Sequence, residues 1–525
     1  MQSDKDNIKE VQLRVDPATA ASELKLKGLV STQLQIDANR ITSLRITRRS
    51  IDARQRRVMV LLTVRVTLDI PPATDSLCEP RRFEPVAADA PEAIVVGAGP
   101  AGLFAALRLI QLGVRPVLIE RGKDVDSRRK DMAEIARSGK VDPDSNYCFG
   151  EGGAGTYSDG KLYTRSKKRG DTQDILHILC QHGASEDILV DAHPHIGTDC
   201  LPDIIKAMRQ TIERCGGRVM FGTRMTGLII TDGKVAGVNT TNGDFRGPVI
   251  LATGHSARDV YHQLIDCGVH IEPKGIAVGV RLEHPQQLID TIRYHNPAGR
   301  GKYLPPAEYT MLTRVDGRAV YSFCMCPGGV IVPAATAPGE MVVNGMSASR
   351  RGSRWANSGM VVEILPEDVA DGDSGPLKMM RFQQEIEKRF FEDGDGSQNA
   401  PAQRMTDFVE GRDSKSLAAS SYAPGLHPAR VDRLLPEGVA VRLREAFREF
   451  GKKNRGFLTA EATVIGDETR TSSPVRVTRD PESLSSVSTP GLFPAGEGAG
   501  YAGGIVSAAI DGQRAAEAVA SYLSE

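Results

Sequence analysis

Apolar and polar positions alternate in distinct ways along this chain, and one unbroken apolar run lies at residues 93–96. Four consecutive apolar residues there predict a strand that is covered on both faces, because such a strand needs no polar side. Apolar positions then recur at helical spacing from Leu103 to Ile110, and Gly113 is placed to end that helix. A second apolar run at residues 117–119 completes a predicted strand–helix–strand unit.

The first 70 residues follow another pattern and predict a small domain of their own. Residues 11–15, 41–47 and 57–68 alternate apolar and polar positions, as half-buried strands do, and residues 18–29 have helical spacing. This strand–helix–strand–strand order indicates an α+β domain, for which a ferredoxin-like arrangement is one candidate. Residues 71–91 are rich in Pro, Ala and Asp and are typical of a linker.

The remainder of the chain predicts one α/β domain that is interrupted by a second unit. A buried strand at residues 249–252 belongs with the first strands, and the sequence from 258 to 457 is longer and more irregular. We interpret residues 258–457 as an inserted α+β substrate domain. The predicted fold class is therefore α/β, with residues 92–257 and 458–525 forming a Rossmann-like nucleotide-binding domain around the insertion.

Three glycines follow the first apolar strand in the spacing of a dinucleotide-binding turn. Gly97 allows a tight turn, Gly99 lets the backbone approach a pyrophosphate, and Gly102 lets the next helix pack closely on the strand. The free N–H groups of that helix would bind the pyrophosphate. Glu120 ends the second strand, where its carboxylate can accept hydrogen bonds from a ribose. This acid suits FAD or NAD better than NADP, which carries a 2′-phosphate.

A glycine turn before a helix also occurs in proteins that bind no nucleotide, so the motif alone is weak. Here a strand precedes it, and a helix, a second strand and an acidic residue follow in the required order. This context favours the dinucleotide site over a purely structural turn.

Glycine is also concentrated in residues 148–161. A loop so rich in glycine can pass close beside a flat ligand, because side chains would otherwise obstruct it. In a protein that holds a dinucleotide, Gly152 and Gly153 are expected near the ring system of that ligand. A glycine-rich surface loop is the alternative interpretation.

The C-terminal glycines include a second formal match to the dinucleotide motif, at Gly498, Gly500 and Gly503. Too little chain follows for another strand–helix–strand unit, so this match does not predict a second nucleotide domain. We interpret the segment as a strand, an acid, a glycine turn and a helix start. Glu497 can bind ribityl hydroxyls there, and the helix dipole can face a flavin ring.

Composition and charge exclude several broad classes. Lys and Arg together number 66 and so do Asp and Glu, which leaves no net field to attract nucleic acid or an anionic membrane. Residues 1–10 are polar and do not form a signal peptide, and no apolar run is long enough to span a bilayer. The eight cysteines form no zinc-type cluster. We therefore expect a cytoplasmic protein with reduced thiols, no structural metal and neither DNA nor membrane as a partner.

Two sequence features leave alternatives open. The N-terminal region carries a run of arginines that can contact RNA or can form a solvated sheet edge; the nearby acidic residues favour the second interpretation. These arginines are Arg45, Arg48, Arg49, Arg54, Arg56 and Arg57. Cys324 and Cys326 would share one face of a strand and can act as a redox pair. Disulfides between such near neighbours are strained, however, and buried free cysteines are ordinary core residues.

Taken together, these motifs resemble those of FAD-dependent oxidoreductases with a two-dinucleotide-type nucleotide domain. More closely, the chain resembles an uncharacterised bacterial family of FAD-dependent dehydrogenases with an extra N-terminal domain. The resemblance extends over nearly the whole chain, through segments such as 149–161, 254–258, 322–329, 468–476 and 496–504. It implies FAD and an oxidoreductase activity but no agreed substrate.

The resemblance also implies positions for the cofactor. Gly97, Gly99 and Gly102 would hold the pyrophosphate, and the C-terminal glycine turn would lie against the isoalloxazine. The full set of residues expected to bind FAD is Gly97, Gly99, Ala101, Gly102, Glu120, Arg121, Gly152, Gly153, Ala252, Gly254, Gly496, Glu497, Gly503, Gly504 and Ile505.

The leading functional hypothesis is a dehydrogenase or reductase that moves a hydride between flavin N5 and a small substrate, with NAD(P)H as a candidate transient electron donor. Tyr321, Lys161 and His255 are candidate proton donors, and Arg470 is a candidate carboxylate anchor. His255 equally suits a backbone-bonding role, and Arg470 a loop cap. The alternatives are a flavin enzyme that binds RNA through its N-terminal domain and a non-enzymatic flavin scaffold or redox sensor.

Overall fold

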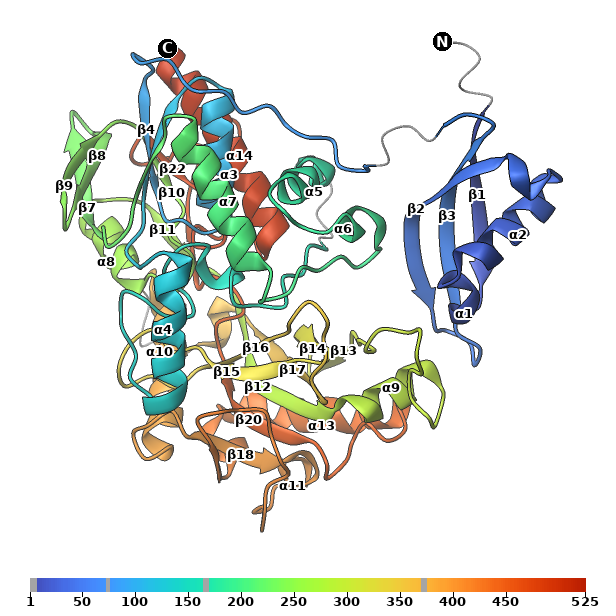
Figure 1. Ribbon diagram of the computed structural model, residues 1–525. Coiled ribbons are helices and arrows are strands. Elements are labelled where there is room, and N and C mark those ends of the chain that lie inside the picture. Colours follow the sequence, from blue (N-terminus) through green and yellow to red (C-terminus); the bar gives the residue numbers. More distant parts are fainter. Residues whose placement is uncertain (1–6, 72–75, 164–169, 370–374) are drawn as a thin grey trace.

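The computed structural model describes residues 7–71, 76–163, 170–369 and 375–525. Figure 1 shows three parts: a small N-terminal sheet at one end, an α/β part that contains both the first glycine turn and the C-terminal helix, and a lower part built on a large sheet. Within the described residues, no helix combines the length and apolar character that a membrane span requires.

The N-terminal part is a three-stranded antiparallel sheet with helices on one face. Its strands, in the order β1-β3-β2, are β1 (Ile8–Val15), β3 (Met59–Leu68) and β2 (Ile41–Asp52). The single helix expected at residues 18–29 is instead two, α1 (Pro17–Ala20) and α2 (Glu23–Leu34), because Ser22 caps a new helix start. A ferredoxin-like fold has a second helix and a fourth strand. The described sheet has three strands, so a ferredoxin-like arrangement is not what forms here.

The α/β part is organised around a five-stranded parallel sheet in the order β22-β10-β4-β5-β6. The strands are β4 (Glu92–Val96), β5 (Arg115–Ile119), β6 (Arg218–Met220), β10 (Val249–Leu251) and β22 (Leu492–Pro494). The two apolar runs expected as strands at residues 93–96 and 117–119 lie at its centre as neighbours. Nearly all of their residues are buried, because layers cover both faces of the sheet.

Helices cover one face of this sheet and a small antiparallel sheet covers the other (Figure 1). On the first face, α3 (Pro100–Gln111) packs against α14 (Ile505–Ser524), with α5 (Thr172–Gln181) and α7 (Leu201–Arg214) beside them. A Cβ at Gly512 of α14 would lie 2.0 Å from the carbonyl oxygen of Ala101, so the two helices touch backbone to backbone. On the other face lie β7 (Met225–Thr231), β8 (Lys234–Thr240), β9 (Gly243–Arg246) and α8 (Arg258–Asp266).

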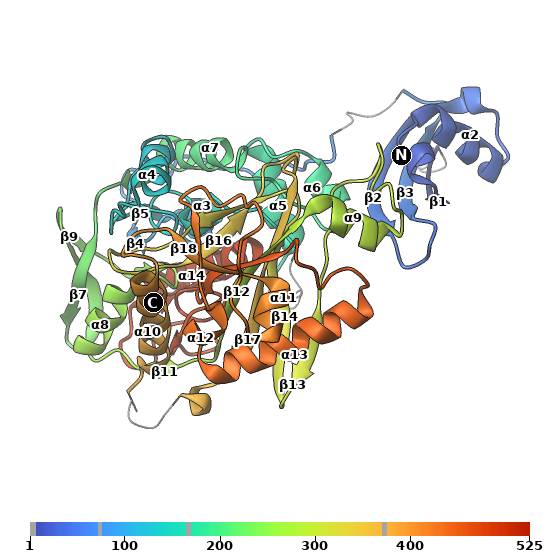
Figure 2. The ribbon, with the colours of Figure 1, turned by 90° about the horizontal axis from the view of Figure 1, so that it is seen from below.

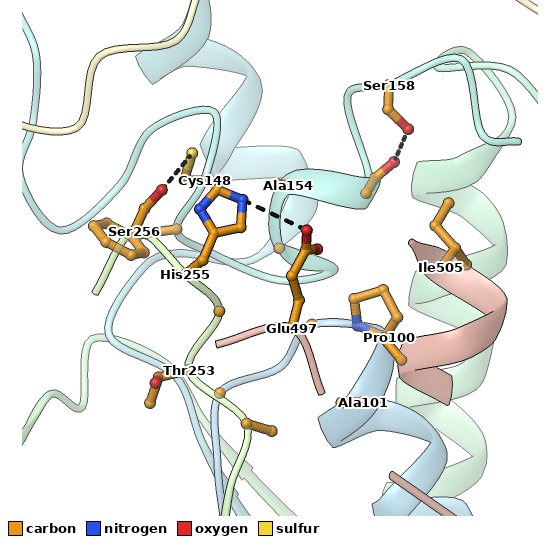
Figure 3. A pocket seen from close by; sticks show the side chains of 18 of the residues that line it. Pro100, Ala101, Cys148, Ala154, Ser158, Thr253, His255, Ser256, Glu497 and Ile505 are labelled. Atoms are coloured by element: carbon orange, nitrogen blue, oxygen red, sulfur yellow. Dashed lines mark hydrogen bonds and ion pairs between the residues drawn. The ribbon is translucent and has the colours of Figure 1, made fainter. Parts of the chain in front are cut away.

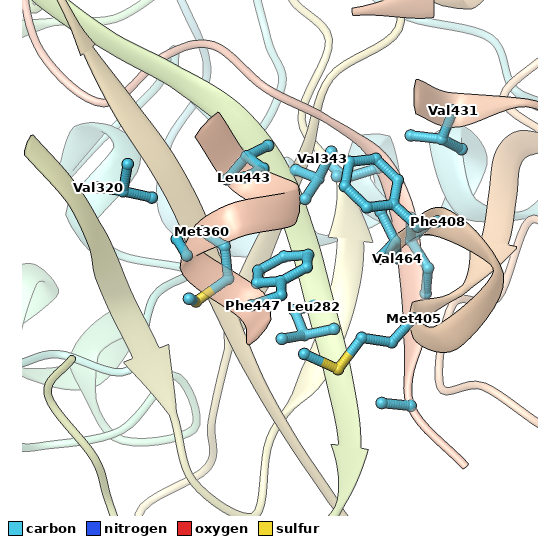
Figure 4. Close-up of a cluster of buried hydrophobic side chains, with 14 of the residues drawn as sticks. Leu282, Val320, Val343, Met360, Met405, Phe408, Val431, Leu443, Phe447 and Val464 are labelled. Carbon is cyan, nitrogen blue, oxygen red and sulfur yellow. The ribbon is translucent and has the colours of Figure 1, made fainter. Parts of the chain in front are cut away.

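The inserted part is built on a seven-stranded sheet in the order β13-β14-β17-β12-β20-β18-β19. Its strands are β12 (Ile276–Pro285), β13 (Leu312–Val315), β14 (Arg318–Cys326), β17 (Trp355–Ile364), β18 (Ala400–Arg404), β19 (Leu426–Pro428) and β20 (Thr463–Glu468). Figure 2 shows the long helix α13 (Glu437–Lys453) lying along this sheet. Phe447 and Leu443 of α13 pack on Leu282 and Met360 of the sheet in the cluster that Figure 4 shows.

The end expected for the inserted domain, residue 457, falls short of its sheet. β20 lies beyond that residue and pairs with both β12 and β18 near the middle of the sheet. The chain enters and leaves the insertion through β11 (Ile271–Pro273) and β21 (Val475–Val477), which pair antiparallel. The two chain segments that connect the inserted part to the α/β part therefore lie side by side. The C-terminal boundary of the insertion could be located only from the pairing of β20 with strands distant in sequence.

Ion pairs dock the N-terminal sheet onto the α/β part. The Arg49 guanidinium lies 2.6 Å from a carboxylate oxygen of Asp191 and 3.0 Å from one of Asp187, and Arg45 pairs with Glu186. The Ala192 N–H also donates to the Arg49 carbonyl at 2.9 Å. Two arginines of the basic run therefore contact acidic residues of this chain itself.

Candidate functional site

One cavity of about 380 Å³ lies at the carboxyl ends of β4, β5 and β10, between the α/β part and the inserted part. Ligands of open parallel sheets bind at these strand ends, and the volume is within the usual range for a ligand pocket. Figure 3 shows Pro100, Ala101 and Ile505 on one side of the cavity and His255 with Ser256 on the other, with Glu497 between them.

The glycine turn after β4 forms the floor of this cavity. Gly97 has a φ of +103°, and a Cβ there would lie 2.5 Å from the carbonyl oxygen of Ala252. A Cβ at Gly102 would lie 1.8 Å from the carbonyl oxygen of Gly97. Gly97 and Gly99 line the cavity, whereas Gly102 lies behind it as the helix-packing residue that the motif predicts.

Two helices begin at the cavity wall without a side-chain cap. α3 starts after Gly99 and α14 starts after Gly504, and no side chain of the described chain bonds to the first amides of either helix. Such N–H groups and the helix dipole attract anions and electron-rich oxygens. A Cβ at Gly503 or Gly504 would meet nothing within 4 Å, so there is open space beside the start of α14.

Glu120 is buried at the end of β5, where it binds backbone N–H groups in addition to the ribose role that the sequence predicts. One carboxylate oxygen accepts a hydrogen bond from the Ala98 N–H at 2.8 Å. The other accepts from the N–H groups of Gly122 at 2.9 Å and Gly150 at 3.0 Å. A carboxylate has about four acceptor positions, so about one remains for a ribose hydroxyl. Glu120 therefore also fixes the glycine turn and the glycine-rich loop in position.

The glycine-rich loop passes directly beside the first glycine turn. A Cβ at Gly153 would lie 3.2 Å from the Cα of Gly99, and the Gly152 N–H donates to the Ala98 carbonyl at 2.8 Å. Gly153 lines the cavity, whereas Gly152 is buried beneath it against Thr156.

Most of the other expected cofactor residues surround the same space. Arg121 lies over the Phe149 ring at 4.5 Å and is held by Asp259 at 2.7 Å. Gly496 lies outside the lining, and its N–H donates to Asp511. The expected cofactor residues that line the cavity are Gly97, Gly99, Ala101, Glu120, Arg121, Gly153, Ala252, Gly254, Glu497, Gly503, Gly504 and Ile505.

Glu497 and His255 face one another in the cavity. The His255 Nε2 lies 3.8 Å from a carboxylate oxygen of Glu497 (Figure 3). Burial raises the pKa of Glu497 to about 7. Burial, together with the nearby Arg470 and Arg258 cations, lowers the pKa of His255 to about 4. Near neutral pH the imidazole is therefore uncharged, and Glu497 is the better candidate for holding a proton.

Arg470 lines the cavity, but its carboxylate partners belong to the protein. Its guanidinium lies 2.6 Å from Glu340 and 2.8 Å from Glu387, and it also donates to Thr336. Arg258 pairs with the same two carboxylates, each at 2.8 Å. Arg470 is thus neither a loop cap nor a free anchor for a substrate carboxylate, because the buried Glu387 and the partly buried Glu340 already neutralise the two cations.

The remaining two candidates are placed differently. Lys161 lines the cavity, and its backbone forms an isolated bridge with His195. Tyr321 does not line it; it lies half-buried on β14, opposite Val361 of β17. Burial raises the pKa of its phenol, which makes it a poorer acid. The structure therefore separates Tyr321 from the other candidate proton donors.

The inserted part supplies a wall that the sequence analysis did not assign to the site. Phe323, Cys324 and Asn344 all line the cavity. Cys324 has a φ of +45°, in the left-handed region that side chains other than glycine rarely adopt. The Cys-X-Cys pattern was visible in the sequence, but its place beside the cofactor site depends on how the two sheets meet.

Three family matches follow the parts of the structure. A domain of unknown function matches residues 7–67, an FAD binding domain matches residues 91–245, and an FAD-dependent protein C-terminal domain-like family matches residues 275–471. The last match begins and ends near β11 and β21, the paired strands through which the chain enters and leaves the inserted part.

The chain is also similar to individual proteins. An uncharacterized protein of Clostridium beijerinckii is 39% identical over 528 residues, which cover 97% of each chain. Protein FixC of Salmonella typhi is 22% identical over 219 residues, which cover 38% of this chain and 45% of that protein. A geranylgeranyl bacteriochlorophyll reductase-like structure from Thermoplasma acidophilum is 15% identical, with a TM-score of 0.35 over 82% of this chain and 78% of that one. The chain therefore belongs to the family of the Clostridium protein, a family of FAD-dependent proteins, and its cofactor is FAD.

Proposed function

We propose that the protein is an FAD-dependent dehydrogenase or reductase that transfers a hydride between the flavin and a small substrate. The observation that carries this proposal is the cavity that joins the glycine turn of the FAD-binding part to side chains of the inserted part. A substrate in this cavity would have Lys161 from the α/β part and Phe323 and Asn344 from the inserted part within its surroundings. Catalytic pockets are commonly built at such domain junctions.

The residues present fit FAD. Gly97, where a side chain would collide with Ala252, leaves backbone at the floor for a pyrophosphate, and α3 directs uncapped N–H groups at the same place. Glu120 keeps an acceptor position for the adenosine ribose, and the open space at the start of α14 suits the flavin ring. When bound, FAD supplies the two-electron chemistry, and the protein supplies orientation and electrostatics.

The chain's own groups would then handle protons and charge. The Glu497 carboxyl, with a pKa raised to about 7, can hold a proton at neutral pH and release it to a basic partner. His255 stays neutral and can position a polar group through either ring nitrogen. The Lys161 ammonium places positive charge where an anionic substrate group or a reduced flavin would benefit from it.

The test is a flavin spectrum followed by anaerobic mixing of the purified protein with NADH and with NADPH. Bleaching of the flavin bands by one nucleotide would identify a reductase with a nicotinamide donor. Bleaching by neither, but by a substrate from a panel of small hydroxy, amino or unsaturated compounds, would identify a dehydrogenase. A flavin that no donor of either kind reduces would count against hydride transfer and favour a scaffold or sensor role.

A further inference from the structure

Cys324 and Cys326 lie at a break in the strand that forms the inner wall of the cavity. Phe323 of β14 pairs with Gly359 of β17, and Cys326 pairs with Asn357. Three steps along β14 therefore match two along β17, which defines a β-bulge. Bulges are common beside active sites, where they redirect a side chain. Although the bulge interrupts regular alternation, the Cys324 and Cys326 side chains remain close enough to interact.

The bulge gives the two thiols different surroundings within one site. Cys324 lines the cavity, and its φ of +45° is a conformation that costs free energy and persists mainly at functional sites. Cys326 is fully buried behind it, where its thiol donates to the Cys324 carbonyl at 3.4 Å. The Arg281 guanidinium donates to the Cys326 sulfur, also at 3.4 Å. An ordinary core cysteine needs neither the strained backbone nor the opening into the cavity.

Electrostatics distinguish the two sulfurs further. The interaction with the Cys326 side chain, with the cations Lys161 and Arg281 nearby, lowers the pKa of Cys324 below its usual value. The same interaction, together with burial, raises the pKa of Cys326. Cys324 therefore ionises before Cys326, which provides the thiolate–thiol combination from which disulfides form and exchange.

We propose that Cys324 and Cys326 form a second redox centre, a dithiol–disulfide pair that exchanges two electrons with the FAD in this cavity. In the oxidising direction, the S–H bond of Cys326 breaks and a bond forms between the two sulfurs. The pair loses two electrons and one proton. Oxidised FAD accepts the two electrons, takes up the Cys326 proton and one proton from solvent, and ends as the reduced dihydroflavin. The reverse step returns the electrons to the sulfurs.

This inference goes beyond the hydride transfer proposed above, because it concerns electron storage within the chain and requires no particular substrate. It predicts that the fully reduced protein holds four electrons per FAD, two on the flavin and two on the sulfurs. The experiment is an anaerobic titration of the FAD-loaded protein with dithionite, monitored by the flavin absorbance. We expect the wild-type protein to consume twice the reductant that the flavin alone requires.

Two variants and a control locate the extra electrons. Cys324→Ser and Cys326→Ser should each halve the uptake to the value for flavin alone, because a single sulfur cannot form the intramolecular disulfide. Cys267→Ser removes a half-buried thiol at the end of α8, outside the cavity, and should leave the uptake at the wild-type value. If both cavity variants retain the full uptake, another pair of cysteines carries it and the assignment is wrong.

Peptide mass gives a readout that does not depend on the folding of any variant. Trypsin should release residues 319–350 as one peptide, because cleavage follows Arg318 and Arg350. After alkylation of the denatured wild-type protein, the oxidised sample should yield this peptide unalkylated and two hydrogen atoms lighter than the dithiol form. The dithionite-reduced sample should yield it with two alkyl groups. Two alkyl groups in both samples, with reductant uptake equal to that of flavin alone, would overturn the proposal while leaving hydride transfer open.

Discussion

Gly102 is the residue at which α3 comes closest to the turn before it, the turn at which we propose that the FAD pyrophosphate binds. A Cβ there would lie 1.8 Å from the Gly97 carbonyl oxygen, and neither backbone segment can move without shifting the turn. We expect Gly102→Ala to destabilise the protein by about 1–3 kcal/mol, the usual cost of overpacking. It should also reduce the FAD content of the purified protein.

The control is Gly28→Ala in the exposed interior of α2, where a new Cβ meets nothing within 4 Å. Alanine favours helix over glycine by up to about 1 kcal/mol, so this change should be neutral or stabilising. Chemical denaturation and the ratio of flavin to protein absorbance measure both effects. Equal FAD content and stability in Gly102→Ala and wild type would contradict the tight contact.

Burial of Glu497 makes the stability of the protein depend on pH below neutrality. Its pKa rises from 4.5 to about 7 in the folded protein. Between these values the unfolded chain has lost the proton and the folded chain retains it, so the free energy of unfolding falls as the pH rises from about 4.5 to about 7. Below pH 4.5 the free energy of unfolding has lost nothing through Glu497, and above about pH 7 the decrease caused by Glu497 is complete.

We therefore expect Glu497→Gln to gain stability relative to wild type as the pH rises through this window. The gain should reach at most about 3 kcal/mol, since one pKa unit corresponds to about 1.4 kcal/mol. Urea titrations of the FAD-free protein at pH 5 and pH 8 measure it. Glu482→Gln, at an exposed turn, is the matched control and should show no such trend. A constant difference between Glu497→Gln and wild type at both pH values would contradict the raised pKa.

At the scale of elements, two arginines and two glutamates join the inserted part to the FAD-binding part. Arg258 begins α8, Glu387 lies on α10 (Lys378–Asp393), and Arg470 follows β20. All three side chains are largely or fully buried, and the cations hold the pKa of Glu387 at about 2. The cluster therefore links the two parts that enclose the cavity.

Removal of the Glu387 carboxylate should lower the free energy of unfolding, because Arg258 and Arg470 would then share Glu340 as their one carboxylate partner in the cluster. We expect Glu387→Gln to destabilise the protein by about 3–5 kcal/mol, as for other broken buried ion pairs. Glu392→Gln on the same helix changes an exposed pair with Lys388 and should cost less than about 1 kcal/mol. Thermal unfolding of the two variants side by side makes the comparison, and similar melting temperatures would argue against the cluster as the domain link.

At the scale of the whole molecule, the N-terminal sheet stands at one end and touches the FAD-binding part through a small set of polar contacts (Figure 1). Arg49 is central to them, because its side chain pairs with Asp187 and Asp191 and its carbonyl accepts from Ala192. Partly exposed ion pairs are individually weak, and the N-terminal part is also held at the inserted part, where Val58 joins the apolar core and the Ala53 carbonyl accepts a hydrogen bond from His295 at 3.0 Å.

Reversal of one charge should therefore loosen the docking without unfolding either part. We expect Arg49→Glu to speed hydrogen exchange at the Ala192 amide, since like charges would face Asp191 and Asp187. Arg56→Glu changes an exposed arginine in the loop between β2 and β3 and should leave that amide protected. Exchange measured by mass spectrometry on peptides that contain residue 192 distinguishes them. Unchanged protection in Arg49→Glu would show that other contacts hold the domain.

The sequence by itself determined the FAD-binding core, because its signals are local. These signals lie within about 30 consecutive residues: the apolar run of β4, the glycines at 97, 99 and 102, and the acid at 120. Each residue type is explained by the sterics or hydrogen bonding at its own position. Twelve of the fifteen expected cofactor residues line one cavity; five of them lie between Gly97 and Arg121, and the other seven come from distant segments that carry short motifs of their own. The strand pattern of the N-terminal sheet was equally local, and its three strands formed where alternation placed them.

Only the tertiary structure decided what the cavity contains besides the cofactor residues. Phe323 and Cys324 are adjacent on β14, where strict alternation would place them on opposite faces, yet both line the cavity because the strand bulges there and the two sheets meet. Arg470 found its partners more than 80 residues away in sequence, at Glu387 and Glu340. Three features depend on contacts between segments that are distant in sequence: the bulge, the buried ion cluster and the last strand of the insertion. Such contacts produce no hydrophobic periodicity, so the sequence pattern does not predict them.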